Sequence, residues 1–158
     1  MKIIIAGAGE VGTHLAKLLS RENFDILLLD EDASKLRDLE ASFDLLTSIG
    51  SPTSIKDLKE VSIEKADLFI AVTPSESVNM TACMLATNLG AKRTLARIDN
   101  YEYLQPVNKE FFKKLGVDYL IYPEMLAAKE IVESLSTSWL RQNLNFCDNA
   151  LILLGIKV

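Results

Sequence analysis

The sequence predicts an α/β fold built on a doubly wound parallel sheet, and three observations support this prediction. Short apolar runs without charges recur along the chain, as expected for strands that are buried on both faces of a parallel sheet. Segments in which apolar residues follow helical spacing separate these runs. Glycines in G-x-G-x-x-G spacing directly follow the first run, at the predicted junction of a strand and a helix.

The alternation of strands and helices favours right-handed βαβ units in one sheet. The predicted strands cover residues 3–6, 26–29, 44–49, 67–72, 93–98 and 117–122. They fit a six-stranded parallel sheet in the order 3-2-1-4-5-6 with helices on both faces, the Rossmann arrangement. Ser75 offers an N-cap for the helix after the fourth strand, and Gly90 is expected to end that helix. Pro106 is expected to break or displace the helix predicted over residues 100–115.

The three glycines of the motif each meet a physical requirement of a nucleotide-binding loop. Gly7 lets the chain turn sharply, Gly9 leaves room for a pyrophosphate, and Gly12 lets the helix lie close to the sheet. The free N–H groups and the positive end of the helix dipole then face the phosphates. The alternative, in which the glycines serve packing alone, explains Gly12 but gives no reason for the whole motif.

Asp30 follows the second predicted strand, about 20 residues beyond the glycines. There its carboxylate can accept hydrogen bonds from the two hydroxyls of an adenosine ribose, whereas a 2′-phosphate would meet a negative charge. We therefore expect the pocket to favour NAD over NADP. The alternative is that Asp30 is a helix N-cap for Glu31 and the residues after it. In the predicted strand order, the loops of residues 7–12, 50–53 and 73–75 meet at the ligand.

Composition limits the possible functions. The chain has 158 residues, 49% of them hydrophobic and 25% charged, which suits one sizeable core. Its net charge of −5 and scattered basic residues argue against nucleic acid as a partner. No apolar stretch is long enough to span a bilayer. Cys83 and Cys147 fit no metal or redox spacing, so no metal is expected, and two free thiols suit a reducing cytosol.

The sequence resembles the TrkA-type regulators of potassium uptake and their RCK (regulator of K⁺ conductance) N-terminal domain. The matching stretches are IIIAGAGEVGTHLAKLLS, LLLDED, GSPTSIKDL, ADLFIAVTPSESVNMTACMLATNLGAKRTLARIDNYEY and KKLGVDYLIYPE. They cover nearly all of residues 1–124, and the two segments AVTPSESVNM and LARIDNYEY are more specific than the glycine motif.

The resemblance implies three segments. Residues 1–124 would form a Rossmann nucleotide-binding domain, and residues 125–145 a helix and linker toward a subunit contact. The chain ends in the stretch NFCDNALILLGIKV, which begins at Asn145. Residues 146–158 of this stretch look like the first strand of the family's C-terminal domain, cut off early. The strand predicted over residues 150–158 has no later partner in the chain, so we expect a truncated chain or pairing with another chain.

The resemblance also implies a function. Proteins of this family are cytoplasmic subunits, peripheral to the inner face of the cell membrane, that assemble into homo-oligomers through their Rossmann domains. They bind NAD(H) or ATP/ADP and gate a membrane potassium transporter or channel. The residues carried over as nucleotide-binding are Gly7, Ala8, Gly9, Glu10, Val11, Gly12, Asp30, Glu31, Ser51, Thr53, Thr73, Pro74 and Arg97.

Within that set, residues 7–11 would hold the phosphates, Asp30 the ribose, and Ser51 and Thr53 would line the adenine side. Arg97 would face the phosphates or the far end of the ligand; its alternative is an ion pair with a surface carboxylate. Some relatives that respond to ATP carry an arginine after the second glycine, where this chain has a glutamate, Glu10. Because a carboxylate would repel a triphosphate, we expect NAD or NADH rather than ATP or ADP.

The chief alternative is a fragment of an NAD-dependent oxidoreductase that lacks its substrate domain. Hydride transfer needs a substrate pocket and a proton donor beside the nicotinamide. The sequence has no Ser/Tyr-x-x-x-Lys dyad after the fourth strand and no evident His–carboxylate pair, so we predict no catalytic residue and no enzyme. A second alternative, an adaptor with a vestigial site, does not explain the intact glycines and Asp30.

Overall fold

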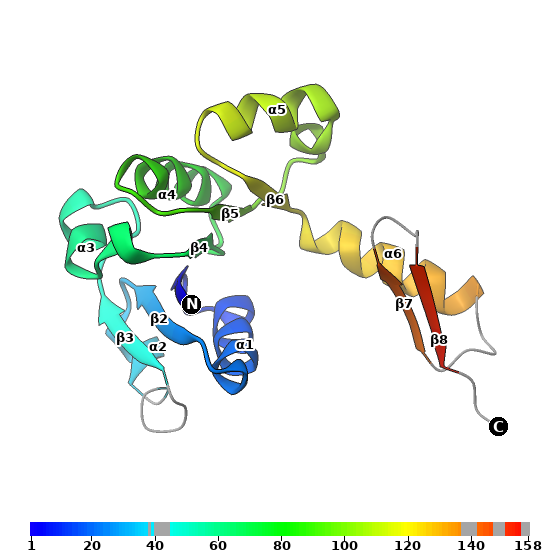
Figure 1. Cartoon of the computed structure of the whole chain (residues 1–158), viewed down its shortest axis with the longest axis horizontal. Coiled ribbons are helices and arrows are strands. Elements are labelled where there is room, and N and C mark those ends of the chain that lie inside the picture. The colour runs from blue at the N-terminus through cyan, green and yellow to red at the C-terminus, as the bar shows by residue number, and fades with distance from the viewer. Residues whose placement is uncertain (38, 40–44, 137–141, 147–150, 156–158) are drawn as a thin grey trace. The chain divides into compact units, whose positions relative to one another are not determined.

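The structure is a computed structural model of the chain, and it describes residues 1–37, 39, 45–136, 142–146 and 151–155 (Figure 1). The chain divides into two compact units, Met1–Ile121 and Tyr122–Val158.

The first unit is built on a six-stranded sheet in the order β3-β2-β1-β4-β5-β6. Every neighbouring pair in this sheet is parallel. The strands are β1 (Lys2–Ala6), β2 (Asp25–Asp30), β3 (Leu46–Ile49), β4 (Leu68–Ala71), β5 (Thr94–Arg97) and β6 (Tyr119–Ile121). The predicted fold class and strand order are therefore confirmed. The observed strands end within a few residues of the predicted ones; residue 44, where the third was expected to begin, lies outside the described residues.

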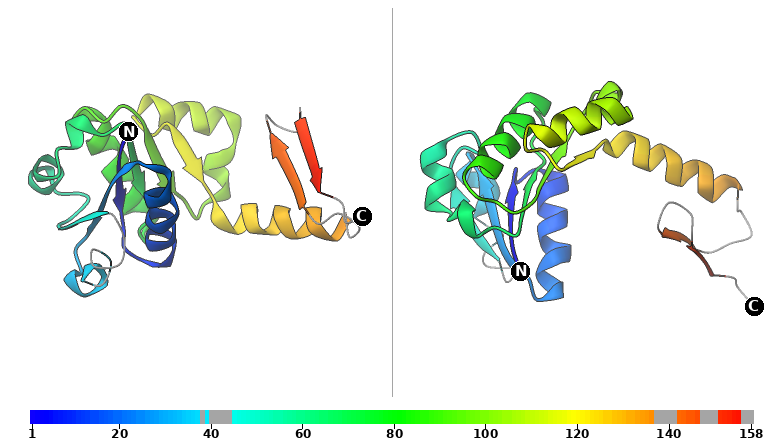
Figure 2. Two further views of the ribbon diagram at one scale, coloured as in Figure 1. Left: turned by 60° about the horizontal axis from the view of Figure 1, so that its bottom comes forward. Right: turned by 45° about the horizontal axis from the view of Figure 1, so that its top comes forward.

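Helices cover both faces of this sheet. They are α1 (Glu10–Leu19), α2 (Ala33–Leu36), α3 (Ile55–Glu60), α4 (Glu76–Asn88) and α5 (Pro106–Lys114), with 3-10 turns η1 (Ser20–Glu22), η2 (Ile63–Lys65) and η3 (Tyr101–Leu104). Right-handed crossovers that run in opposite directions from β1 place α1 and α2 on one face and α3, α4 and α5 on the other (Figures 1 and 2). Pro106 is the first residue of α5, and η3 precedes it, so the predicted break is confirmed.

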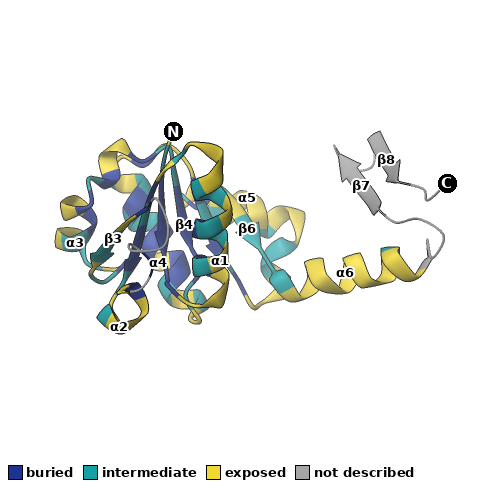
Figure 3. Cartoon of the chain, turned by 90° about the horizontal axis from the view of Figure 1, so that it is seen from below, coloured by how far each residue is buried: buried dark blue, intermediate teal, exposed yellow. Residues whose placement is uncertain are grey.

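The central strands are buried on both faces, which explains their unbroken apolar runs (Figure 3). Ile3 and Ile5 of β1 pack in one cluster with Ala16 of α1 and Leu36 of α2. Ile4 alternates onto the opposite face and is equally inaccessible to solvent. This two-sided core fixes the carboxyl ends of the strands, from which the loops of the candidate site emerge.

The predicted boundaries of α4 are also found. The side chain of Ser75 accepts a hydrogen bond from the Val78 N–H at 3.4 Å and so caps the helix. Gly90 follows the helix with φ +110°, a left-handed conformation that glycine adopts without strain.

The second unit contains α6 (Pro123–Ser136) and two antiparallel strands, β7 (Gln142–Phe146) and β8 (Leu151–Gly155). The two strands pair from Gln142 opposite Gly155 to Phe146 opposite Leu151. The last strand therefore has an earlier partner within the chain, whereas the expectation was a truncated chain or pairing with another chain. Its partner β7 lies mostly in the segment expected to be a linker. No strand was predicted there, because polar and apolar residues alternate over residues 143–146 and give no continuous apolar run. Within the described residues, no helix has the length and apolar character needed to cross a membrane.

Candidate functional site

A crevice of about 260 Å³ opens at the carboxyl edge of the sheet, beside the ends of β1, β2 and β4. It is lined by Gly7, Leu29, Asp30, Glu31, Lys35, Pro52, Thr73, Pro74, Ser75 and Val78. Each of the three loops that were predicted to meet contributes to this lining. The crevice lies where the strand order reverses, which is the general position of ligands in open α/β sheets.

Gly7 holds the loop after β1 in place. Its N–H donates to the Leu29 carbonyl oxygen at 2.8 Å, and its φ of +109° is a conformation that L side chains rarely adopt. A Cβ at this position would also stand only 3.0 Å from the Thr73 backbone nitrogen. The loops after β1 and β4 therefore approach each other closely here, and the site requires glycine.

The other two glycines have different surroundings. A Cβ on Gly12 would collide with the Gly7 carbonyl oxygen, so Gly12 lets the first turn of α1 lie against the preceding loop. Gly9 is exposed, and a Cβ there would meet nothing within 4 Å. Gly9 is the N-cap of α1 and offers no side chain to cap its first N–H groups. Packing thus explains Gly12, whereas it does not explain Gly9, which has open space above it.

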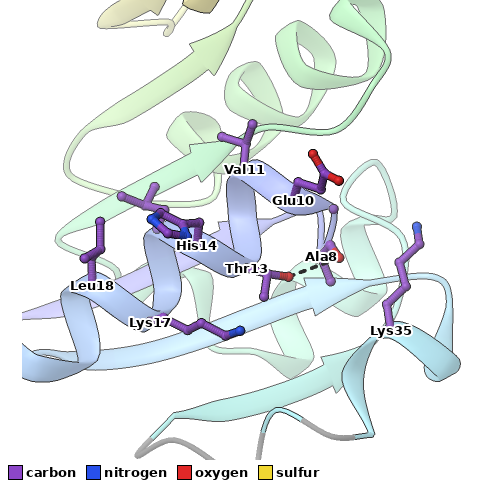
Figure 4. A pocket seen from close by; sticks show the side chains of 10 residues that line it. Ala8, Glu10, Val11, Thr13, His14, Lys17, Leu18 and Lys35 are labelled. Atoms are coloured by element: carbon purple, nitrogen blue, oxygen red, sulfur yellow. Dashed lines mark hydrogen bonds between the residues drawn. The ribbon is translucent and has the colours of Figure 1, made fainter.

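A second, larger and open hollow of about 1,020 Å³ runs along α1 (Figure 4). It is lined by Ala8, Gly9, Glu10, Val11, Thr13, His14, Leu15, Lys17, Leu18 and Lys35. Four of the predicted residues, 8–11, therefore line this groove, whereas Gly7 lines the crevice. The Thr13 hydroxyl donates to the Ala8 carbonyl oxygen at 3.2 Å, which joins the start of α1 to the loop (Figure 4).

Asp30 joins the end of β2 to the glycine loop. Its Oδ2 accepts a hydrogen bond from the Ala8 N–H at 2.6 Å, and its Oδ1 accepts one from the Asp32 N–H at 2.9 Å. The ammonium of Lys35 lies 3.5 Å from Oδ1. The alternative role of Asp30 as a helix N-cap is wrong, because Asp32 caps α2 by accepting from the Ser34 N–H at 2.9 Å. Hydrogen bonds from the Ser34 hydroxyl and N–H also lower the pKa of Asp32.

The loop after β3 contributes Pro52 to the crevice, but its two predicted residues do not line it. The hydroxyls of Ser51 and Thr53 lie 3.2 Å apart. Asp57 of α3 accepts a hydrogen bond from the Ser51 N–H at 2.8 Å and so holds this loop against the helix.

The loop after β4 is held by a buried side chain that the sequence analysis missed. Asn79 of α4 is 1% exposed, and its Oδ1 accepts from the Thr73 N–H at 2.9 Å and from the Thr73 hydroxyl at 2.7 Å. Its Nδ2 donates to the carbonyl oxygens of Thr73 and Arg97, both at 3.0 Å. The amide thus fixes a loop that lines the crevice and ties it to the end of β5. A polar residue among the apolar positions of α4 was the available signal.

Arg97 lies outside the crevice lining. Its side chain is 23% exposed, and its guanidinium pairs with Asp99 at 3.4 Å, in line with the alternative of an ion pair with a surface carboxylate. Glu76 of α4 accepts hydrogen bonds from the N–H groups of Asp99 at 2.6 Å and Asn100 at 2.8 Å. The loop after β5 is therefore also fixed to α4.

Among the residues that the structure describes, no group of three or more His, Cys, Asp or Glu side chains could hold a metal ion. Cys83 is buried in α4, and this burial raises the pKa of its thiol to about 12. His14 is exposed and lines the groove along α1.

The sheet order, the glycine loop and the acid at the end of β2 together define a Rossmann domain. Residues 3–123 match the TrkA-N domain, and the chain belongs to this family, which confirms the resemblance seen in the sequence.

Among its relatives, the chain is 40% identical to the Trk system potassium uptake protein TrkA of Haemophilus influenzae, over 99% of this chain and 35% of that protein. It is 38% identical to a TrkA homologue of Archaeoglobus fulgidus, over 82% of this chain and 29% of that protein. The chain thus spans about a third of the length of these relatives. They are potassium-uptake proteins by name.

Solved structures share the fold at low sequence identity. The TrkA-N domain of the inner membrane protein ybaL from Escherichia coli has a TM-score of 0.73 at 15% identity, over 85% of this chain and 96% of that one. The GsuK channel bound to NAD has a TM-score of 0.69 at 17% identity, over 93% and 25%. GsuK bound to ADP has a TM-score of 0.67 at 19% identity, over 87% and 35%.

Proposed function

We propose that this chain is the nucleotide-sensing part of a regulatory subunit that gates a membrane potassium transporter or channel. NAD or NADH is the favoured ligand, with ATP or ADP as the second choice. The observation that carries the proposal is the crevice formed by three loops, with the carboxylate of Asp30 in its wall and Gly9 open beside it. Relatives named as potassium-uptake proteins, and a channel of the same fold solved with NAD and with ADP, support it.

In the proposed complex, the phosphates lie over Gly9 and meet the first N–H groups of α1. The adenosine ribose lies against Asp30, whose Oδ2 accepts one hydrogen bond from Ala8 and has a second acceptor position. The far end of the ligand extends toward the loop of Thr73 and Pro74, which Asn79 holds. Glu10 stands in the first turn of α1, where its charge opposes a terminal phosphate and favours the dinucleotide.

A sensor of this kind needs at least two arrangements of its subunits. A ligand shifts their populations only by the difference in its affinity for each arrangement, typically ~1–3 kcal/mol. We propose that the chain assembles as a homo-oligomer on the cytoplasmic face of the membrane. The exposed apolar side chains of α6 supply part of the contact; they are Leu126, Ile131, Val132 and Leu135. Size measurement should give a dimer or a larger assembly, and a monomer at high concentration would contradict this part of the proposal.

The ribose assignment is tested by calorimetry with NADH, NAD⁺, ATP and ADP. Asp30→Ala should weaken NADH binding about tenfold, because a hydrogen bond to a charged group contributes roughly 1.5–3 kcal/mol. Asp25→Ala is the matched control, since Asp25 is an exposed acid at the opposite end of the same strand. Thermal unfolding of both variants separates a binding effect from loss of the fold. Unchanged NADH affinity in Asp30→Ala would refute the assignment.

The oxidoreductase alternative predicts turnover. NADH incubated with the protein and a panel of carbonyl substrates should not be oxidised if the chain only senses the nucleotide. Sustained oxidation that is lost in Asp30→Ala would favour the enzyme instead.

A further inference from the structure

Lys35 lies beside Asp30, the carboxylate proposed to bind the ribose. It projects from α2 toward the glycine loop and lines both the crevice and the groove along α1 (Figure 4). Among the residues that line the crevice, all of which the structure describes, it is the one cation, beside the two acids Asp30 and Glu31. Its ammonium lies 3.5 Å from Asp30 Oδ1, and the two side chains are 45% and 11% exposed. Lys35 is therefore held at the wall of the crevice but remains within reach of solvent and of a ligand.

The hydrogen bonds of Asp30 determine where this ammonium acts. Oδ1 already accepts from the Asp32 N–H, and Lys35 approaches the same oxygen. Oδ2 accepts from the Ala8 N–H. Because a carboxylate oxygen has about two acceptor positions, a ribose hydroxyl that binds Asp30 does so with the ammonium as its neighbour. The group attached at the ribose 2′ position thus meets a carboxylate and an ammonium together.

We infer that Lys35 is a specificity-determining residue, which attracts a nucleotide 2′-phosphate at the position where Asp30 repels it. An ammonium is a compact charge that pairs well with phosphate oxygens. Discrimination between NADH and NADPH is then set by the balance of the two side chains and not by the acid alone. This inference rests on the proposed function, because it requires a nucleotide in the crevice.

The two residues should act in opposite directions. Without Lys35, Asp30 faces a 2′-phosphate unopposed, and preference for NADH increases. Without Asp30, the ammonium loses its ion-pair partner and is available to the phosphate, so that NADPH gains relative to NADH. Loss of local structure around α2 would weaken both nucleotides alike and leave their ratio unchanged.

The experiment measures the ratio of the NADPH and NADH dissociation constants by calorimetry on the full chain. Lys35→Gln should raise the ratio about tenfold, which is the lower end of the effect expected when one hydrogen bond between charged groups is lost. Lys35→Arg should keep the ratio near the wild-type value. Asp30→Ala should lower the ratio about tenfold, and adding Lys35→Gln to it should reverse that gain. Lys17→Gln is the control, because Lys17 lines the groove but not the crevice.

Three results are decisive. A ratio that Lys35→Gln leaves within twofold of wild type, while NADH still binds, would overturn this inference and leave the proposed function standing. A ratio that Lys17→Gln changes as much would also overturn it, since the effect would then be one of net charge. Failure of the folded wild-type chain to bind either nucleotide would refute the proposed function itself.

Discussion

Replacing Gly9 by alanine should weaken nucleotide binding while the fold stays intact. The φ of Gly9 is −74°, which alanine adopts without strain, and the added Cβ would meet no protein atom within 4 Å. Alanine is a poorer N-cap residue than glycine, so the free energy of unfolding should fall by about 1 kcal/mol or less. The methyl group would, however, fill the space that a phosphate needs in order to reach the first N–H groups of α1.

The size of the binding effect follows from hydrogen-bond geometry. Moving phosphate oxygens by on the order of 1 Å takes them from about 2.9 Å to beyond hydrogen-bonding distance of these N–H groups. Two such bonds to a charged group contribute roughly 3 kcal/mol together, so NADH should bind about a hundredfold more weakly. Calorimetry with NADH measures the affinity, and urea unfolding measures the stability of the same preparation.

Gly12→Ala is the matched variant from the same motif, with the opposite expectation. Its Cβ would collide with the Gly7 carbonyl oxygen, so the loop and α1 must separate. Because the interior is close-packed, this should cost about 3 kcal/mol of stability. If Gly9→Ala binds NADH as tightly as wild type, the phosphates do not lie over Gly9. If Gly12→Ala is as stable as wild type, the packing of α1 against the loop has been misjudged.

Two further predictions concern α4. Asn79→Ala should lower the free energy of unfolding by about 3 kcal/mol and weaken NADH binding, because backbone groups of Thr73 and Arg97 lose their hydrogen-bond partner. The control, Asn88→Ala on the exposed side of α4, should lower it by less than about 1 kcal/mol. Comparable urea midpoints for the two variants would contradict this prediction. Burial raises the pKa of the Cys83 thiol to about 12, so an aromatic disulfide reagent at pH 8 should modify this thiol no faster than the protein opens. The rate is measured in a Cys147→Ser variant, in which Cys83 is the one remaining thiol, and fast modification would refute its burial. The stability that this neutral thiol contributes should be complete below its unfolded pKa, about 8.5, and should be lost as pH rises toward 12.

The sheet could be predicted because its strands follow from burial alone. Ile3, Ile4 and Ile5 form an unbroken apolar run, and both faces of β1 are covered. Turn residues with a fixed backbone requirement, such as Gly90, marked the ends of elements equally well. The strand β7 was missed because apolar and polar residues alternate in it, and a short alternation in a polar segment is a weak signal.

The candidate site could be predicted only in part, for a physical reason. The glycines and Asp30 are local features whose spacing is visible in the sequence. Lys35 matters because its ammonium approaches Asp30, and Asn79 matters because its amide bonds to Thr73, 6 positions before it, and to Arg97, 18 positions after it. Such contacts depend on how the loops fold onto one another, and no periodicity in the sequence reports them.

The hydrogen bonds between the loops bear on how a sensor could work. Asp30 ties the loop after β1 to the end of β2, and Asn79 ties the loop of Thr73 to the end of β5. The protein's own contacts therefore hold the crevice in shape, and a ligand that enters it orders little additional chain. A rigid site changes little within one domain when it is filled, so the signal must come from ligand groups that extend beyond these loops. For the proposed sensor, NADH and ATP should then differ in effect mainly through their far ends and much less through the adenosine that both share. The far end of NADH extends toward the loop of Thr73 and Pro74, whereas the terminal phosphate of ATP meets Glu10.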